Sequence, residues 1–318
     1  MTKNLILKNS NKNIDILCVG EVLIDFIGHQ NNVLINDTRD YHRYLGGSPA
    51  NVAMNSARLG LNPYMISTVG NDGFGEYIFK RLNEVKVNTN HLKKSQNNST
   101  SVIFVSRSNG TPDFMPYRNA DYHISEDQIS SSMLLQTKIF HTTCFALSKN
   151  PAQKTILEKA KEAKEHGCKL SIDINYAKKL WSSKQEALDV IKTYCSLNPL
   201  IKISEDDMLR LFEKQLPHEE IFDFFHNLGA ETVCLTLGSE GVKLSQIGKK
   251  IIELPAIKVE KVVDTTGAGD AFWSGFLFAY IKEKPVQDCL QVALKLAALK
   301  LQNVGRLPDN INILSKLL

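Results

Sequence analysis

A regular alternation of strand-like and helix-like segments is the feature that most limits how this chain can fold. Short apolar runs rich in β-branched residues recur beyond Ser125, and segments of helical periodicity separate them. We expect strands at 138–142, 169–174, 199–203 and 232–237, with helices between them that include 151–166 and 183–196. Strands that alternate with helices form a mostly parallel sheet with helices on both faces. The pattern therefore predicts a doubly wound α/β fold.

The first half of the chain follows this rhythm and then departs from it. Residues 101–105 and 113–117 predict a hairpin around a turn at Ser108–Gly110. Together with the extended pieces between 21 and 45, this hairpin predicts a small sheet of short antiparallel strands. No internal repeat or low-complexity linker divides the chain. We therefore expect one domain over residues 1–318, in which about 21–45 and 100–118 are inserted in the α/β core.

The stretch from Val262 to Phe272 carries the clearest chemistry. Its Thr-Thr-Gly-Ala-Gly-Asp sequence follows a β-branched run and leads into an apolar segment that we expect to be helical from about Ala268. The backbone amides of Gly267, Ala268 and Gly269, together with the helix dipole, can surround an anion such as a phosphate. Asp270 follows directly and can take a proton from a hydroxyl group that attacks the phosphate. This arrangement is typical of a phosphotransferase, although an Asp in a first helical turn is also a common cap.

The same stretch resembles the C-terminal signature of the ribokinase-like, or PfkB-type, carbohydrate kinases. Its D-T-T-G-A-G-D-A-F core matches that signature without a substitution. The resemblance implies an ATP-dependent sugar kinase of ribokinase-like fold, in which the small sheet acts as a lid over the sugar. It also implies that Asp270 is the catalytic base, that residues 267–269 form the anion hole, and that Mg²⁺ accompanies ATP. A K⁺ site near Asp264 and Thr265 is a further implication.

A second signature lies near the N-terminus. Residues 46–51 open a predicted helix and resemble the G-G-x-x-x-N motif of the same family, whose glycine amides and Asn bind sugar hydroxyls. The family's G-E-x-x-x-D motif is matched just before, and it ends here at Asp25. Without the resemblance, this isolated acid could be a surface residue of an edge strand. The resemblance implies sugar contacts from Asp25, Gly46, Gly47 and Asn51.

Two segments match the family's nucleotide-binding motifs less closely. Residues 235–241 resemble T-L-G-x-x-G, and residues 204–207 occupy the place of N-x-x-E but read S-x-x-D. The resemblance implies nucleotide contacts from Ser204, Thr236, Gly238, Gly241 and Gly269. It also implies an indirect metal contact from Asp207. A capped, acidic first helical turn explains residues 204–207 equally well.

One motif departs from the family pattern at a position that bears on the substrate. Residues 173–181 resemble D-x-N-x-R-x-x-L-W, which implies that Asp173 binds the substrate and Asn175 the nucleotide. Ala177 stands where the family has an Arg that would help to hold phosphate or substrate. Lys178 is offset by one residue, so its side chain is expected to point elsewhere. The sequence thus predicts one cation fewer in the site.

The end of the predicted hairpin indicates the kind of sugar. Residues 114–121 resemble the F-x-x-Y-R-N-x-x-A-D stretch of bacterial fructokinases, with two residues missing before Ala120. The resemblance implies substrate contacts from Phe104 and Arg118, although Arg118 taken alone reads as a surface residue. Related 2-keto-3-deoxygluconate kinases also place an Arg here. Because Ala177 removes a second cation, we expect a neutral ketose, fructose, before a sugar acid.

Composition argues against several other classes of protein. The 318 residues carry a net charge of +4 with scattered lysines, which disfavours nucleic-acid binding. No apolar run is long enough to cross a membrane, so no membrane partner is expected. The six cysteines form no CxxC pair, and the histidines show no metal-ligand spacing. We therefore expect buried, reduced thiols in a cytoplasmic protein.

Other functions remain to be weighed against a kinase. A Rossmann oxidoreductase and a P-loop NTPase would each need a glycine motif that this chain lacks. A non-catalytic sugar or nucleotide sensor on a kinase scaffold is permitted by the departures at Ala177 and Asp207. We predict an ATP-dependent kinase for a primary hydroxyl of fructose, with 2-keto-3-deoxygluconate or another sugar or nucleoside of the family as alternative acceptors.

Apolar side chains on both faces of the lid also predict a homodimer through the lids.

Overall fold

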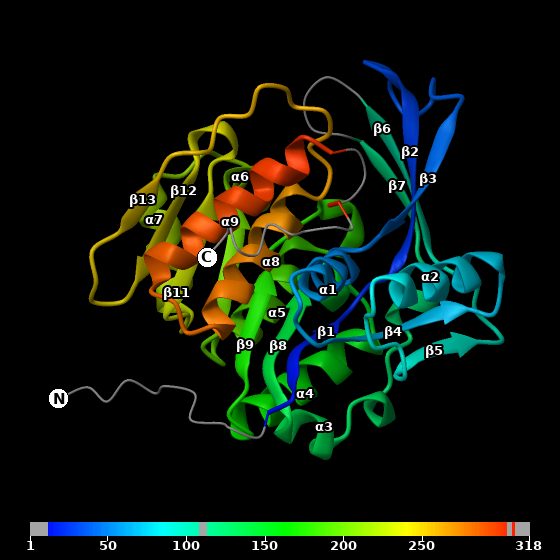
Figure 1. Ribbon diagram of the computed structural model, residues 1–318, viewed down its shortest axis with the longest axis horizontal. Helices are drawn as coiled ribbons and strands as arrows, with labels where there is room; N and C mark the ends of the chain where they lie inside the picture. Colours follow the sequence, from blue (N-terminus) through cyan, green and yellow to red (C-terminus); the bar gives the residue numbers. More distant parts are fainter. Residues whose placement is uncertain (1–11, 108–112, 304–306, 309–318) are drawn as a thin grey trace.

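A nine-stranded sheet lies at the centre of the computed structural model, which describes residues 12–107, 113–303 and 307–308 (Figure 1). In order across the sheet, the strands are β13 (Ile252–Leu254), β12 (Val242–Gln246), β11 (Thr232–Thr236), β10 (Leu200–Ser204), β9 (Lys169–Asp173), β8 (Thr137–Thr143), β1 (Ile14–Val19), β4 (Pro63–Gly70) and β5 (Leu92–Ser95). The strands from β11 to β5 pair in parallel, and β12 and β13 are antiparallel additions at one edge. The predicted mostly parallel sheet is confirmed.

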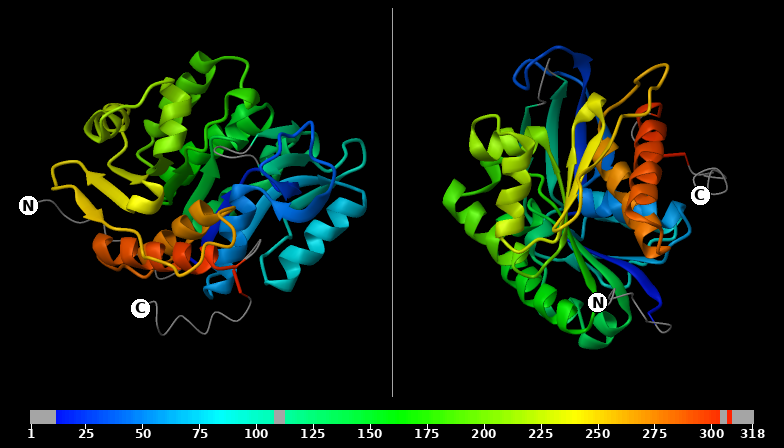
Figure 2. Two further views of the ribbon diagram at one scale, coloured as in Figure 1. Left: turned by 90° about the horizontal axis from the view of Figure 1, so that it is seen from above. Right: turned by 90° about the vertical axis from the view of Figure 1, so that its left-hand side faces the viewer.

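Helices cover both faces of this sheet (Figure 2). On one face lie α1 (Ser48–Arg58), α2 (Gly73–Glu84), α8 (Ala268–Ile281) and α9 (Val286–Leu301). On the other lie α3 (Ser131–Leu135), α4 (Ala152–Glu165), α5 (Lys184–Cys195), α6 (Glu205–Phe212) and α7 (His218–Asn227). Successive side chains of a strand point to opposite faces of the sheet. In β1, Ile16 and Cys18 therefore belong to the hydrophobic core under α1, α2, α8 and α9, and Leu17 and Val19 to the core under α3–α7. Among the described helices, none has the length and apolarity to cross a membrane.

A second, four-stranded sheet stands beside the first and forms the lid (Figure 1). Its order is β3 (Tyr41–Gly46), β2 (Leu23–Asn31), β6 (Val102–Arg107) and β7 (Phe114–Tyr117). Contrary to the expectation of antiparallel strands alone, β2 and β6 pair in parallel, because the chain passes through α1, β4, α2 and β5 between them. The turn predicted at Ser108–Gly110 lies outside the described residues. Leu23 and Ile103 of the lid share a core with the main sheet, so we propose that the chain forms one domain.

Candidate active site

The loop before α8 meets the carboxyl ends of the parallel strands, where ligands of doubly wound sheets bind. Gly267 precedes the helix with φ of 73°, a left-handed conformation that glycine adopts without steric cost. The Ala268 amide donates to Thr265 O at 3.1 Å, which closes the turn. As the N-cap residue, Gly267 has no side chain that could cap the first turn of α8. The N-terminal end of α8 therefore directs its positive dipole outward, as an anion hole requires, and the Ala268 amide would have to leave Thr265 O to bind an anion.

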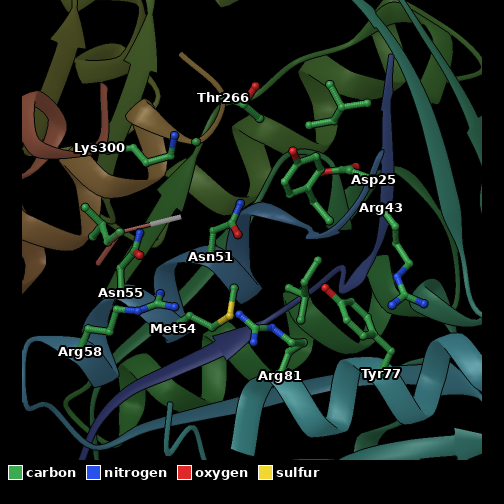
Figure 3. Close-up of a pocket in the computed structure, with 15 residues that line it drawn as sticks. Asp25, Arg43, Asn51, Met54, Asn55, Arg58, Tyr77, Arg81, Thr266 and Lys300 are labelled. Carbon is green, nitrogen blue, oxygen red and sulfur yellow. The ribbon is translucent and has the colours of Figure 1, made fainter. Parts of the chain in front are cut away.

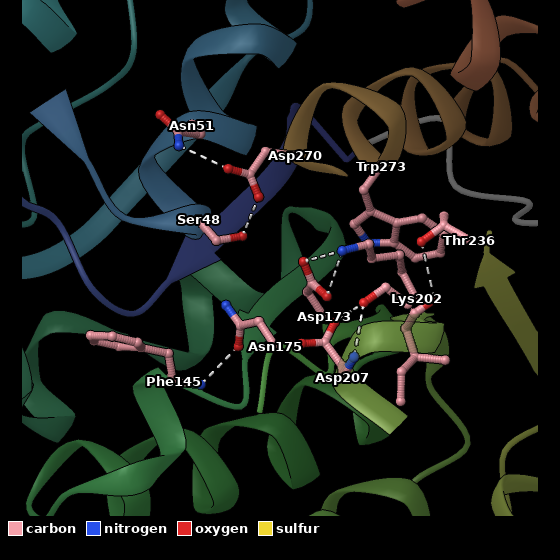
Figure 4. Close-up of polar contacts among 12 residues, drawn as sticks. Ser48, Asn51, Phe145, Asp173, Asn175, Lys202, Asp207, Thr236, Asp270 and Trp273 are labelled. Atoms are coloured by element: carbon pink, nitrogen blue, oxygen red, sulfur yellow. Dashed lines mark hydrogen bonds and ion pairs between the residues drawn. The ribbon is translucent and has the colours of Figure 1, made fainter. Parts of the chain in front are cut away.

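Asp270 lies in this first turn, and each of its two carboxylate oxygens accepts a hydrogen bond from the first turn of α1 (Figure 4). Ser48 Oγ donates to Asp270 Oδ1 at 2.6 Å, and Asn51 Nδ2 donates to Asp270 Oδ2 at 2.8 Å. Burial raises the pKa of the Asp270 carboxyl, while the two hydrogen bonds and the ammonium groups of Lys202 and Lys300 act in the opposite direction. A fixed carboxylate whose pKa lies above its ordinary value is suited to accept a proton.

Asp25 lies at the end of β2 that faces Asp270. Burial raises the pKa of Asp25 to about 7, and the nearby Asp270 carboxylate adds to this effect. A Cβ atom at Gly46 would overlap the Asp25 carboxylate, so only glycine lets the two approach each other here. Gly47 follows as the N-cap of α1, and its carbonyl accepts from Asn51 N at 2.9 Å. The structure thus brings together four of the residues predicted to bind the substrate: Asp25, Gly46, Gly47 and Asn51.

A cavity of about 300 Å³ lies beside Asp25 and Asn51 (Figure 3). Asp25, Asn51, Thr266 and Gly267 contribute to its lining, so the predicted sugar and phosphate groups face one space. The volume is at the lower end of the range for small-molecule sites. The remaining lining residues include several cations and an aromatic residue: Arg43, Arg58, Tyr77, Arg81 and Lys300. The cavity can therefore hold a polar, hydroxylated ligand.

Lys202 is a candidate functional residue that the sequence analysis missed. This buried side chain of β10 donates to the Asp173 carboxylate at 2.9 and 3.0 Å. A Cβ atom added at Gly269 would lie 3.0 Å from Lys202 Nζ, so the ammonium lies against the first turn of α8. Burial disfavours its charge, but the carboxylates of Asp173, Asp207 and Asp270 outweigh burial and raise the pKa of Lys202. An isolated lysine within the apolar run Leu-Ile-Lys-Ile-Ser was the available signal.

The partner of Lys202 is Asp173, for which a substrate contact was predicted. Burial raises the pKa of Asp173 to about 7, although the Lys202 ammonium opposes this change. Asp173 is only 2% exposed, and both of its oxygens bond to Lys202. The contacts of Asp173 in the structure are therefore with the protein, and its role toward the substrate remains a prediction.

The predicted nucleotide-binding residues lie on the same side of the sheet, at the ends of β9, β10 and β11 (Figure 4). Asn175 accepts from Phe145 N at 3.0 Å, and Thr236 donates to Ile203 O at 3.3 Å. Gly238 and Gly241 bound the short turn after β11. Each of these contacts holds a loop in place, and the nucleotide contacts remain predictions.

Ser204 and Asp207 form a helix cap, the structural alternative to a nucleotide and metal site. Ser204 Oγ accepts from Asp207 N at 3.1 Å at the start of α6 and donates to Asp207 Oδ2 at 2.5 Å. Arg210 donates to Asp207 Oδ1 at 2.8 Å. Each oxygen of Asp207 thus accepts one side-chain hydrogen bond, and the predicted indirect contact with a metal remains a prediction.

Arg118 and Phe104 do not line the cavity. The side chain of Arg118 is 2% exposed, and its guanidinium donates to Asp121 from two nitrogens at 2.6 and 2.9 Å and to Ser148 Oγ at 2.6 Å. Phe104 packs at 5.1 Å from the ring of Phe26 within the lid. The contacts seen for both residues are structural, so their predicted role in substrate binding receives no support from the geometry.

The gap at Ala177 is not filled by its neighbour. Lys178 Nζ lies 3.0 Å from Glu213 Oε1, and its side chain is 79% exposed. This orientation agrees with the expectation that a one-residue offset directs the side chain elsewhere.

Comparisons with known proteins show which family this chain belongs to. A model described as "pfkB family carbohydrate kinase" matches residues 13–311. The ATP-dependent 6-phosphofructokinase of Thermoanaerobacterium thermosaccharolyticum is 37% identical over 94% of this chain and 91% of its own length. The probable fructokinase-6 of Arabidopsis thaliana is 32% identical over 92% of this chain and 79% of its own length.

Solved structures show the same similarity. The Halothermothrix orenii fructokinase superposes with a TM-score of 0.80 at 34% identity, over 89% of this chain and 98% of that one. The sugar kinase PH1459 of Pyrococcus horikoshii, solved in complex with ATP, superposes with a TM-score of 0.82 at 28% identity, over 95% of this chain and 100% of that one.

Proposed function

This chain belongs to the pfkB family of carbohydrate kinases, and we propose that it transfers the γ-phosphate of ATP to a primary hydroxyl group of fructose. Its fold is ribokinase-like, and it is an ATP-dependent sugar phosphotransferase. The observation that carries the proposal is the position of Asp270. This carboxylate lies in the first turn of α8, whose positive dipole suits a phosphate, and it accepts from Asn51, which lines the cavity.

In the proposed reaction, Asp25 and Asn51 bind sugar hydroxyls and direct the acceptor hydroxyl toward Asp270. Asp270 removes the proton from that hydroxyl as its oxygen attacks the γ-phosphorus. The amides of residues 267–269 stabilise the negative charge on the transferring group. Lys202, which lies against Gly269, adds a fixed positive charge at the same place.

The nucleotide is proposed to lie along Asn175, Ser204, Thr236, Gly238 and Gly241, at the ends of β9, β10 and β11. Asp173 and Asp207, near these residues, carry carboxylate oxygens, the type of ligand that Mg²⁺ prefers. We propose that Asp207 contacts the ion through water, since its own oxygens bond to Ser204 and Arg210. When bound, Mg²⁺ neutralises charge on the nucleotide phosphates.

A phosphorylated fructose is a second candidate acceptor, because one end of the cavity is rich in arginines. Thr266 and Lys300 lie on one side of Asn51, and Arg43, Tyr77 and Arg81 lie on the opposite side (Figure 3). The guanidinium of Arg43 stacks 3.9 Å from the Tyr77 ring centroid. A hydroxyl group at Asp270 would therefore place an acidic group at the other end of the sugar near these cations. The relative named as a 6-phosphofructokinase supports this candidate.

A panel of acceptors tests the proposal. The protein is incubated with Mg-ATP and with fructose, fructose 6-phosphate, 2-keto-3-deoxygluconate, ribose or a nucleoside, and ADP formation is measured. We expect ADP with a fructose-type ketose. Absence of ADP with every acceptor, despite binding of ATP, would support a sensor instead of a kinase.

An arginine variant separates the two candidate acceptors. If fructose 6-phosphate is the substrate, Arg81→Gln should lower the ratio of its kcat/KM to that of fructose by at least about tenfold, since a charge-assisted hydrogen bond is lost. Lys80→Gln is the matched control, because Lys80 is an exposed neighbour on α2 that does not line the cavity.

We also propose a homodimer in the cytoplasm. The outer strand of the lid exposes apolar side chains, with Met115 42% and Tyr117 57% exposed. Such side chains favour contact with a second lid. All six cysteines are buried free thiols, as suits a reducing compartment. A monomeric mass by light scattering at micromolar concentration, with full activity, would contradict the dimer.

A further inference from the structure

Lys300 is a buried cation surrounded by oxygen atoms. It lies in the last turn of α9, and its side chain is 3% exposed. Lys300 Nζ lies 3.2 Å from Asp264 Oδ2 and 3.5 Å from the Asp264 carbonyl oxygen, and it donates to Asn303 O at 3.1 Å. One carboxylate oxygen and two carbonyl oxygens thus surround the ammonium group.

These oxygens belong to the segment that leads into the anion hole. The amides of Val263 and Asp264 both donate to Leu301 O, at 2.8 and 3.3 Å, which fastens this segment to the end of α9. Thr265 and Gly267 follow directly, and Lys300 Cε lies 3.8 Å from the position that a Cβ atom at Gly267 would take. The Lys300 ammonium therefore lies directly beneath the loop that is proposed to hold the transferring phosphate.

We propose that the Lys300 ammonium takes the place of a monovalent cation at Asp264, so that the proposed kinase reaction needs no K⁺. An ammonium group and K⁺ carry the same charge, and both are bound by carbonyl and carboxylate oxygens. Oδ2 and the carbonyl oxygen of Asp264 already face Lys300, and Oδ1 accepts from Thr266 N at 2.9 Å. A second cation beside the Lys300 ammonium would be repelled. The K⁺ expected near Asp264 and Thr265 does not fit this donor set.

The consequence is a cation site that is always occupied by the Lys300 ammonium group. Lys300 neutralises the buried Asp264 carboxylate, so the electrostatic field at the anion hole stays positive without an ion from solution. Since the inference uses the proposed kinase reaction for one of its readouts, a second readout that does not depend on turnover is needed.

A K⁺ titration of the wild-type protein gives both readouts. Activity with the Tris salt of ATP and MgCl₂ is measured from zero to 100 mM KCl, with tetramethylammonium chloride keeping the ionic strength constant, and Tm is recorded in the same buffers. We expect less than a twofold change in kcat and the same Tm with either salt. Activation of about tenfold or more by K⁺, or a rise in Tm that K⁺ gives and tetramethylammonium does not, would overturn the inference.

A truncated side chain should convert the site into one that needs an ion. Lys300→Ala leaves the oxygens of Asp264 and Asn303 in place, so we expect kcat to fall at least tenfold without K⁺ and to recover with K⁺ or NH₄⁺ but not with tetramethylammonium. Lys284→Gln removes an exposed charge between α8 and α9 and should show no such dependence. Full activity of Lys300→Ala without any added cation would overturn the inference.

The two proposals can fail separately. If no acceptor gives ADP, the proposed reaction is wrong, and calorimetric titration with KCl still decides the cation question. Uptake of K⁺ by the wild-type protein would then overturn the inference, and uptake by Lys300→Ala alone would support it. If Lys300→Ala does not fold, the wild-type titration of activity and Tm decides.

Discussion

Asn51 Nδ2 donates a 2.8 Å hydrogen bond to Asp270 Oδ2, and this bond joins the N-terminal turns of α1 and α8. The two residues are 219 positions apart in the chain. Asn51 belongs to the predicted sugar side of the cavity and Asp270 to the phosphate side. The Asn51–Asp270 hydrogen bond therefore helps to orient the proposed base, Asp270, relative to the sugar hydroxyl that it would deprotonate.

The first prediction is that Asp270→Asn removes most turnover and leaves ATP binding nearly intact. Loss of a general base typically costs about 10²–10⁴-fold in rate. The neutral amide keeps the shape of the side chain, so the nucleotide site should persist. Stopped-flow or steady-state kcat and a calorimetric Kd for ATP check both parts. Asp288→Asn, an exposed change in the first turn of α9, is the control. A near-normal kcat for Asp270→Asn would refute the role of base.

The second prediction is that Lys202→Met lowers kcat by about 10²-fold, the usual cost of removing one group that stabilises transition-state charge. The variant also leaves the buried Asp173 carboxylate unpaired, so its free energy of unfolding should fall by about 3–5 kcal/mol. The double variant Asp173→Asn/Lys202→Met removes both charges and should regain most of the lost Tm. Recovery of kcat in the double variant would show that Lys202 only neutralises Asp173.

Much of the fold could be predicted because burial imposes a period on the sequence. The predicted strands at 138–142 and 232–237 agree within one residue with β8 and β11, since both are apolar runs covered on two faces. The parallel pairing of β2 with β6 was not predictable, because the residues of a strand do not indicate the direction of its partner. The path of the intervening chain decides that direction.

The candidate site divides in the same way. Gly267 and the Gly46–Asn51 segment could be found because their conformations are local and only a few residue types allow them. Arg118 could not be placed, since its partners Asp121 and Ser148 depend on how the lid meets the loop after β8. Lys202 could not be recognised from the sequence, because its position in the site depends on the carboxylates that other segments bring close to it.

The third prediction concerns pH. Burial raises the pKa of Asp25 from 3.8 to about 7 in the folded protein, so the folded state binds a proton that the unfolded state releases. The stability from this group is present below the unfolded pKa and is lost as pH rises through the folded pKa. The expected loss is about 1.4 kcal/mol per pH unit in this window.

The variant Asp25→Asn should therefore raise Tm at pH 8 more than at pH 5 and flatten the decline of Tm between these values. Thermal denaturation of the ligand-free protein across this range measures the effect. Asp37→Asn, an exposed change in the loop between β2 and β3, should leave the slope of Tm against pH unchanged. An equal Tm change at pH 5 and pH 8 in Asp25→Asn would contradict the raised pKa.

The last prediction is that kcat/KM for fructose exceeds that for 2-keto-3-deoxygluconate by at least about tenfold, or about 1.4 kcal/mol. A carboxylate in a water-excluded site needs a charge-assisted partner, and poor pairing costs about 1–3 kcal/mol. Arg118 is bound to Asp121 and Lys178 to Glu213, so neither cation is directed at the sugar. Competition between the two sugars in one assay measures the ratio. A preference for the acid would mean that the arginine-lined end of the cavity binds a carboxylate, and Arg43→Gln should then abolish that preference.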